Sequence, residues 1–190
     1  MKLRFSLVKH ALSLLSLCWG MQTAVAATVQ QTLVVSSSMT QNTCYINGTS
    51  QTGASVAVLS LNLGTVPAAS FAVAGRKGNV VSVSNNVVLS NCPANISVMF
   101  SLDSALGSWD ASTKAYKNQS TVNAATNIQA EILNAEGGAN ILLVPGGAGV
   151  TKTTDGAGSA KFTIGSRFSS VGKVTPGQFS TTAWFNITYP

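Results

Sequence analysis

The chain has 190 residues, of which 45% are hydrophobic and only 8% are charged, and its formal net charge is +6. Three of the eleven basic residues lie within the first nine positions, so the remainder carries eight basic and five acidic residues, a net charge of +3. Arg76 and Lys77 form the only adjacent basic pair, and no aromatic residues are interleaved with the basic ones. This distribution excludes a nucleic-acid-binding surface and is typical of solvated single charges.

Residues 1–26 are predicted to be an export signal. Basic residues precede an apolar stretch that ends at Trp19, and Ala24-Val25-Ala26 has the small residues of a cleavage site. The apolar stretch is short and interrupted by serines, which disfavours a retained membrane anchor. We therefore expect a mature chain that starts at Ala27, has no membrane anchor and is long enough, at about 164 residues, for one sandwich-sized domain.

The segment 27–43 is predicted to be a strand that precedes the domain. It contains no Gly, Pro or charged residue, and it alternates in the manner of a half-buried strand. An ordinary first strand of the same domain is the competing interpretation. We favour a strand that fills a groove in another subunit, by β-strand addition, because the segment lies outside the predicted disulfide and the far end of the chain has an uncovered strand. The predicted inward face consists of Val29, Gln31, Leu33, Val35, Ser37 and Met39.

Cys44 and Cys92 are the two cysteines that remain once the signal is removed. In an exported protein such a pair is expected to form one disulfide. Closing a loop of that length stabilises a fold by roughly 4 kcal/mol in the chain-entropy model. A metal centre or reactive thiol is the alternative, but the mature chain has no histidine and no neighbouring cysteine to support it. We therefore expect no metal and no cofactor.

The rest of the chain has the pattern of an all-β domain. No long segment keeps an apolar period of 3.6 residues, whereas Val, Ile, Thr and Phe recur in short runs separated by Gly, Asn, Ser and Pro. We expect a long loop or short hairpin over 103–127. Seven or so short strands predict an immunoglobulin-like sandwich, although no tryptophan stands between the two cysteines. The predicted strands cover residues 56–66, 80–89, 96–102, 128–133, 141–144, 161–167 and 183–189.

The last predicted strand ends one residue before the carboxyl end of the sequence given. Phe185, Ile187 and Tyr189 fall on one face at a period of two, so this strand is expected to be half buried. No later strand covers its edge. We therefore expect another segment to pair with it.

These features together resemble the subunits of chaperone-usher fimbriae, the type 1 pilin-like family. The resemblance covers the mature chain and rests on the N-terminal extension, the two cysteines and three motifs. The penultimate aromatic of the family matches Tyr189, and the family's glycine fourteenth from the end matches Gly177. The motifs are Leu63-Gly64-Thr65-Val66, Val87-Val88-Leu89-Ser90-Asn91-Cys92 and Phe185-Asn186-Ile187-Thr188-Tyr189-Pro190.

The resemblance implies an incomplete immunoglobulin-like β-sandwich that lacks its final strand. It divides the chain into a signal peptide (1–26), a donor-strand extension (27–43) and a pilin domain (44–190). It also implies a surface fimbria as the location, neighbouring fimbrial subunits, a periplasmic chaperone and an outer-membrane usher as partners, and no catalysis. Gly177, Phe185, Ile187 and Tyr189 would form the motif read by chaperone and usher. The family's extension commonly has a glycine at one inward position, for which Ser37 is the small residue here.

Three other interpretations are weighed against this one. A tip adhesin or adaptor would bind host glycan, with Trp109, Asp110 and Tyr116 stacking on and hydrogen-bonding a sugar. A catalytic function is the second interpretation. The five acidic residues form no recognisable acid-base constellation, so the remaining possibility for catalysis is a Ser and Lys pair brought together by the fold. A glycosylated secreted sandwich would use the acceptor patterns at Asn47, Asn95, Asn118 and Asn186, the last of which lies inside a predicted strand.

Overall fold

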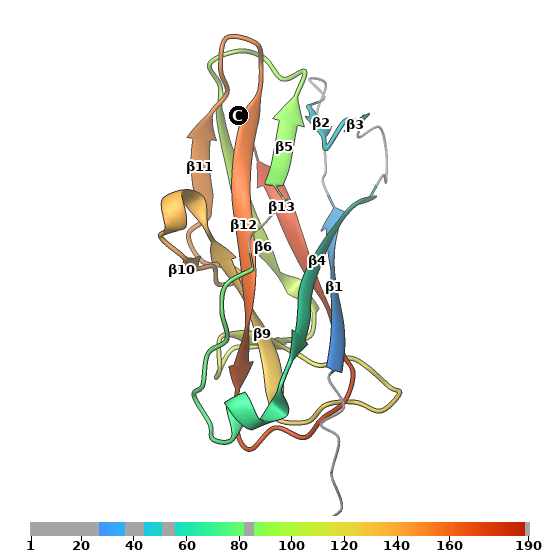
Figure 1. Ribbon diagram of the computed structural model, residues 1–190. Helices are drawn as coiled ribbons and strands as arrows, with labels where there is room; N and C mark the ends of the chain where they lie inside the picture. Colours follow the sequence, from blue (N-terminus) through green and yellow to red (C-terminus); the bar gives the residue numbers. More distant parts are fainter. Residues whose placement is uncertain (1–26, 37–43, 51–55, 82–85, 189–190) are drawn as a thin grey trace, which may run out of the picture.

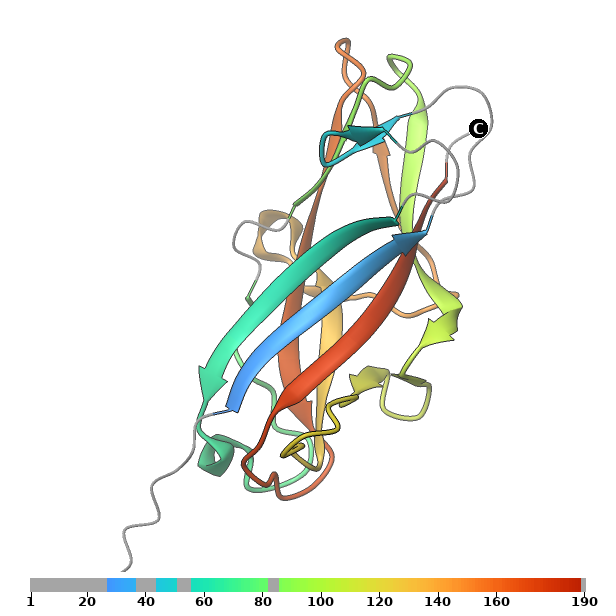
Figure 2. The same ribbon diagram turned by 90° about the vertical axis from the view of Figure 1, so that its right-hand side faces the viewer.

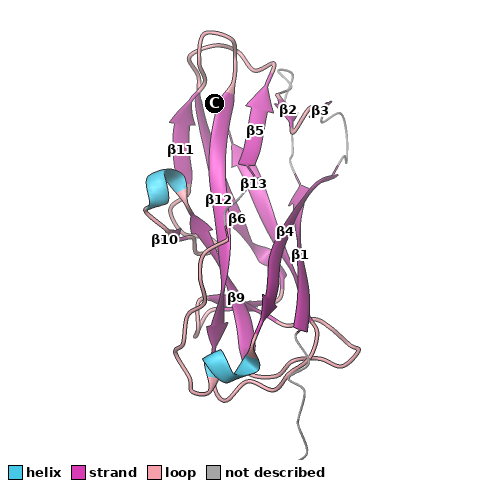
Figure 3. Ribbon diagram, in the orientation of Figure 1, coloured by secondary structure: helices cyan, strands magenta, loops and turns pink. Residues whose placement is uncertain are grey.

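The computed structural model describes residues 27–36, 44–50, 56–81 and 86–188, which fold almost entirely into β-strands with two short 3-10 turns (Figures 1 and 3). No helix in these ranges is both long and apolar enough to cross a membrane. The predicted signal 1–26 lies outside the described residues, as do Ser37, Met39 and Tyr189. The elements are β1 (Ala27–Ser36), β2 (Tyr45–Ile46), β3 (Thr49–Ser50), β4 (Val56–Val66), η1 (Ala68–Phe71), β5 (Asn86–Ser90), β6 (Ser97–Gly107), β7 (Trp109–Asp110), β8 (Ala115–Lys117), β9 (Ile128–Asn134), η2 (Glu136–Gly138), β10 (Ile141–Leu142), β11 (Val150–Thr153), β12 (Ala160–Ser170) and β13 (Phe179–Thr188).

Two sheets pack face to face, which confirms the predicted β-sandwich. One sheet has the order β11-β6-β13-β1-β4, and the other has the order β3-β2-β5-β12-β9-β8-β7, with β10 also paired to β9. Two bridges, Lys77 to Ser169 and Val81 to Ser166, continue the line of β5 along β12. The predicted strand 80–89 is therefore realised as two paired stretches around residues 82–85, which lie outside the described ranges.

The alternation of apolar residues places one face of each long strand in the core. Along β13 every second side chain from Phe179 to Ile187 is buried, and the intervening ones are at least partly exposed. In β12 the residues Phe162 and Ile164 are buried in the same way. The core rings of Phe100 and Phe185 lie 4.6 Å apart, and those of Phe100 and Phe162 lie 5.8 Å apart. Phe100 and Phe185 belong to one sheet and Phe162 to the other, so the second contact joins the two sheets through side chains that the period of two had predicted.

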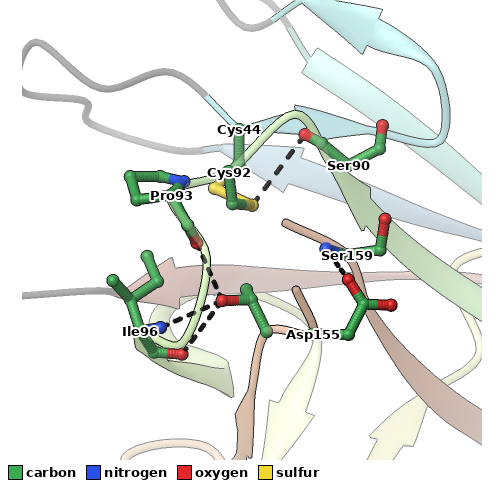
Figure 4. Close-up of a disulfide and its surroundings, with 8 residues drawn as sticks. Cys44, Ser90, Cys92, Pro93, Ile96, Asp155 and Ser159 are labelled. Carbon is green, nitrogen blue, oxygen red and sulfur yellow. Dashed lines mark hydrogen bonds between the residues drawn. A yellow bond between two sulfur atoms is a disulfide. The ribbon is translucent and has the colours of Figure 1, made fainter. Parts of the chain in front are cut away.

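The disulfide between Cys44 and Cys92 is present, as predicted, and joins the first residue of the domain to the loop after β5 (Figure 4). The two Cα atoms are 4.4 Å apart and the residues are 48 positions apart in the sequence. The Cys92 amide donates to the carbonyl of Gly158 at 3.0 Å. The Thr154 hydroxyl donates to the carbonyl of Pro93 at 2.8 Å. The disulfide therefore lies in a firmly bonded corner at one end of the sandwich.

The segment 103–127 contains a short hairpin, which was one of the two predicted alternatives. Strand β6 continues to Gly107, and a short hairpin of β7 and β8 follows, with Trp109 paired to Tyr116. Strand β11 was not predicted, because Val150–Thr153 has only one strongly apolar residue. Strand β11 pairs with β6 at the edge of the sheet. Few of its side chains are apolar, so its sequence lacks the alternation of apolar and polar residues that predicts a strand.

Replacing both Cys44 and Cys92 by serine is expected to lower the free energy of unfolding by about 4 kcal/mol, because the unfolded chain regains the freedom of a long loop. Chemical denaturation of the purified variant against the oxidised wild-type protein measures this loss. Wild-type protein treated with reductant is the matched control and should lose a similar amount. An unchanged midpoint in both samples would contradict the predicted contribution.

Candidate functional site between strands β13 and β4

Strand β1 occupies the position between β13 and β4, where it completes the five-stranded sheet (Figure 2). It runs parallel to β13, with register partners from Val29 and Phe179 to Val35 and Phe185. It runs antiparallel to β4, with partners from Ala27 and Val66 to Ser36 and Val56. Within the described residues β4 has no other partner in this sheet. The strand in this position therefore links β4 to the rest of the sheet.

The register of β1 matches the face that the sequence predicted to point inward. Val29, Leu33 and Val35 lie level with Phe179, Ala183 and Phe185 of β13, which are at most 2% exposed. Gln31 lies level with Thr181, a buried residue whose hydroxyl is 2.7 Å from that of Ser108. Parallel partners share a face of the sheet, so these positions of β1 lie on the core side. The register agrees with the inward face that the sequence predicted, and both this face and a donor role of the strand in another subunit stay predictions.

The floor of this position is an apolar surface in two parts. One cluster of buried residues around Phe100 and Phe185 lies toward the disulfide end. A second cluster lies at the η1 end, where the Phe168 ring is 5.3 Å from that of Phe179 and 6.2 Å from that of Phe71. A cavity of about 20 Å³, lined by residues that include Val66 and Val174, adjoins this second cluster. A strand placed here covers a surface that water would otherwise contact.

A β-bulge in β4 fixes the shape of the rim at the η1 end. Val29 is the partner of Gly64 and Gln30 is the partner of Asn62, so Leu63 is the extra residue. Gly64 has φ of +68°, which glycine adopts without strain, and its amide donates to the Asn62 side-chain oxygen at 2.8 Å. Leu63 is only 6% exposed and belongs to the second apolar cluster. The Leu63-Gly64 motif is therefore the bulge that brings Leu63 into the core.

The C-terminal motif predicted from the sequence is brought together only in part. Phe185 and Ile187 lie on the core face of β13, 0% and 6% exposed. Gly177 lies at the other end of the strand, against the segment 123–125. The Gln178 amide donates to the carbonyl of Asn123 at 2.6 Å. Gly177 therefore has a packing role where β13 begins, well separated along the strand from Ile187.

Two polar residues that sequence reasoning missed hold the start of β13. The Asn118 side-chain oxygen accepts from the amide of Ser180 at 3.0 Å, and the side-chain oxygen of Gln119 accepts from the amide of Thr182 at 2.8 Å. The Gln119 amide donates to the carbonyl of Ser180 at 2.7 Å. Both residues stand in a polar loop with no periodic pattern, so the sequence carries no signal for this role.

Comparison with known proteins decides the family. The family model described as "Fimbrial protein" matches residues 27–190. The chain belongs to the fimbrial protein family. It is a structural subunit of a fimbria, and as such is exported and located at the cell surface, in contact with neighbouring subunits. Structural fimbrial proteins are generally non-enzymatic.

Two solved structures support the same fold. The fimbrial subunit is similar to the P pilus rod subunit PapA, with a TM-score of 0.54 and 17% identity over 77% of this chain and 99% of that chain. It is also similar to a chain in a structure of a chaperone-usher pilus, with a TM-score of 0.52 and 17% identity over 80% of this chain and 91% of that chain. No curated protein sequence matches the chain. At this identity the structures show the shared fold alone.

The glycan site considered for a tip adhesin is wrong in one of its three residues. Tyr116 is 0% exposed and belongs to the main core cluster, where its ring centroid lies 5.3 Å from that of Trp109. Burial raises the pKa of Tyr116 well above its ordinary value. A side chain in that position is inaccessible to a sugar. The sequence could not reveal this, because Lys114 and Lys117 stand close to Tyr116 and its burial comes from contact with other strands.

The acidic residues of the fimbrial subunit lie apart, in separate local contacts. Glu131 is buried and pairs with both Lys77 and Arg167, the latter at 2.7 Å. A hydrogen bond from the Ser112 hydroxyl, reinforced by Lys117, lowers the pKa of Asp110 to about 2. The remaining three acidic side chains also have partners: Glu136 with Lys152, Asp103 with Asn186, and Asp155 with the Ala157 and Ser159 amides. Within the described residues no three metal-ligating side chains gather.

Replacing Gly177 by alanine is expected to cost about 1–3 kcal/mol, because an added Cβ would lie within 2.6 Å of the Ala124 carbonyl carbon and closer still to other backbone atoms. Gly156 is the matched control, since a Cβ there meets nothing within 4 Å. Thermal unfolding of Gly177→Ala and Gly156→Ala compares the two. Equal midpoints would show that the 123–125 segment moves aside at no cost.

Proposed function

We propose that this fimbrial subunit polymerises by exchanging its N-terminal strand. Residues 27–36 of one copy fill the position between β13 and β4 of another copy, in place of that copy's own β1. The observation that carries this proposal is the place of β1 in the sheet: it lies between two strands that have no bond to each other, and it belongs to a segment outside the disulfide. A strand held in this way can be supplied by any chain with the same inward face.

The pairing of β1 supports exchange because it uses mainly the backbone. Residues 29–35 are register partners of β13 and residues 27–36 are register partners of β4. Backbone groups at both rims need partners, and the backbone of a strand from a second copy supplies them. The inward positions of the incoming strand then meet the apolar floor. Exchange replaces one ladder of backbone bonds with another, so it needs no external energy source.

We further propose that a periplasmic chaperone covers the same position before a neighbour does, and that an outer-membrane usher is where the strands are exchanged. This finer proposal rests on the resemblance to chaperone-usher subunits and on the state of β13 without β1. Phe179, Ala183 and Phe185 would then border an open apolar surface. Such a surface in a free subunit invites aggregation, which a bound chaperone strand prevents. Tyr189 is proposed to extend this contact at the end of β13.

Replacing Leu33 by aspartate is expected to abolish addition of one subunit to another, because position 33 belongs to the predicted inward face of the strand and the change would bring a charge to the apolar floor. Thr32→Asp is the matched control, since position 32 lies level with Thr182 on the other face. Assembly of the purified mature chains is measured by light scattering and electron microscopy. Polymers of Leu33→Asp that form at the wild-type rate would refute strand exchange.

A variant lacking residues 27–36 provides an independent measurement. It is expected to form no polymer and to bind one equivalent of a peptide of residues 27–43, with a higher unfolding temperature in the complex. The same peptide with the Leu33→Asp change should fail to bind.

A further inference from the structure

We propose that one end of the sandwich is the surface on which the domain of the strand-donating copy rests. This surface, called the η1 end, consists of residues 66–75, 119–127 and 171–178 (Figure 1). The inference rests on the proposed strand exchange and adds a second contact to it, between domains. Its occupant is a second copy of this chain.

Exposed apolar side chains concentrate at the η1 end. Val73 is 55% exposed, Val122 is 68% exposed and Val171 is 41% exposed. They come from three separate segments, and among the described residues only Val88 and Ile141 are other large hydrophobic side chains with comparable exposure. Three apolar side chains that converge from distant parts of the sequence on one end are a feature of contact surfaces.

The η1 end is also nearly uncharged. The segments 66–75 and 119–127 contain no Asp, Glu, Lys or Arg, and the segment 171–178 contains only Lys173. Charged residues are depleted at the centre of protein interfaces because burying an unpaired charge is costly. At the opposite end of the sandwich, the segments 44–50, 91–96 and 154–159 contain only Asp155. Stacking of unlike ends would therefore bring one positive and one negative residue toward each other.

Hydrogen bonds hold the three segments of the η1 end in a fixed arrangement. The Ser170 hydroxyl donates to the carbonyl of Val73 at 2.7 Å. The amide of Val171 donates to the carbonyl of Asn127 at 3.0 Å, and the amide of Val174 donates to the carbonyl of Phe71 at 3.1 Å. The surface is thus formed before a partner arrives, which keeps the entropic cost of binding low.

The direction of a growing filament places the donor domain at this end. Each chain extends its own strand from Cys44, which directly precedes β2, and β2 lies at the end of the sandwich opposite η1 (Figure 1). A head-to-tail filament needs its entry and its exit at opposite ends of the subunit, so the incoming strand enters from the η1 end. It then runs antiparallel to β13, opposite to the direction of the chain's own β1.

The short connection between strand and domain keeps the donor domain close. Seven residues, 37–43, join Ser36 to Cys44. Fully extended, they reach about 27 Å. The donor's Cys44 end therefore faces the η1 end of the recipient. There it would cover the exposed side chains of Val73, Val122 and Val171.

Lysine substitutions test the surface with the full mature chain. Val73→Lys, Val122→Lys and Val171→Lys are expected to slow subunit addition about tenfold each, because each places a charge at the interface. The wild-type protein and Ile141→Lys are the controls and should add at the same rate. Uptake of a labelled peptide of residues 27–43 is measured in parallel and should be equal in all four variants, because the peptide carries no domain.

The two readouts separate the inference from the proposed function. If wild-type protein takes up no peptide and Leu33→Asp still polymerises, strand exchange itself is wrong. If peptide uptake is normal and the three η1-end variants add as fast as the controls, the domain contact is overturned. Lys173→Glu serves where a valine variant fails to fold, since Lys173 is an exposed loop residue. It too should slow addition and leave peptide uptake unchanged.

Discussion

The structure depends on a strand being present between β13 and β4. Both strands present a row of backbone amides and carbonyls toward this position, and β4 reaches its sheet only through the strand that fills it. Beneath it lies an apolar floor that includes the fully buried side chains of Phe100 and Phe185. An empty position would leave backbone groups without partners and expose this floor to water. These unpaired backbone groups and this apolar surface are what would bind an incoming strand.

The disulfide determines the direction in which the chain's own β1 runs between β13 and β4. It fixes Cys44 beside Cys92 at one end of the sandwich, so the strand of the same chain has to finish near that end. Strand β1 consequently runs parallel to β13. To run antiparallel in its own sheet, β1 would end some 30 Å from the Cys44 end, beyond the reach of the seven-residue connection. A strand from a second copy has no such restriction, and this difference separates the closed single chain from the proposed filament.

Much of the fold could be read from residue patterns that act locally. The predicted strand 56–66 coincides with β4, and the predicted strands 96–102, 128–133 and 161–167 each lie largely within a longer strand. These patterns are visible because one face of each strand is buried and the other is solvated, which produces a period of two. The edge strand β11 and the burial of Tyr116 were not visible. The environment of β11 is created by β6, and that of Tyr116 by β9 and β13, all of which lie outside the segment concerned.

The sequence by itself determined that residues 27–36 form a strand, the pairing of the two cysteines, the buried face of β13 and the fimbrial resemblance. Each is a property of a short segment or of residue types, so no knowledge of neighbours is needed. Only the tertiary structure decided that β1 lies parallel to β13, that Gly177 packs against residues 123–125, and that the exposed valines meet at one end. These features depend on which free edges and loops come within reach when the sheets close. The distances between such edges and loops depend on how the whole chain folds, so no periodic pattern in the sequence predicts them.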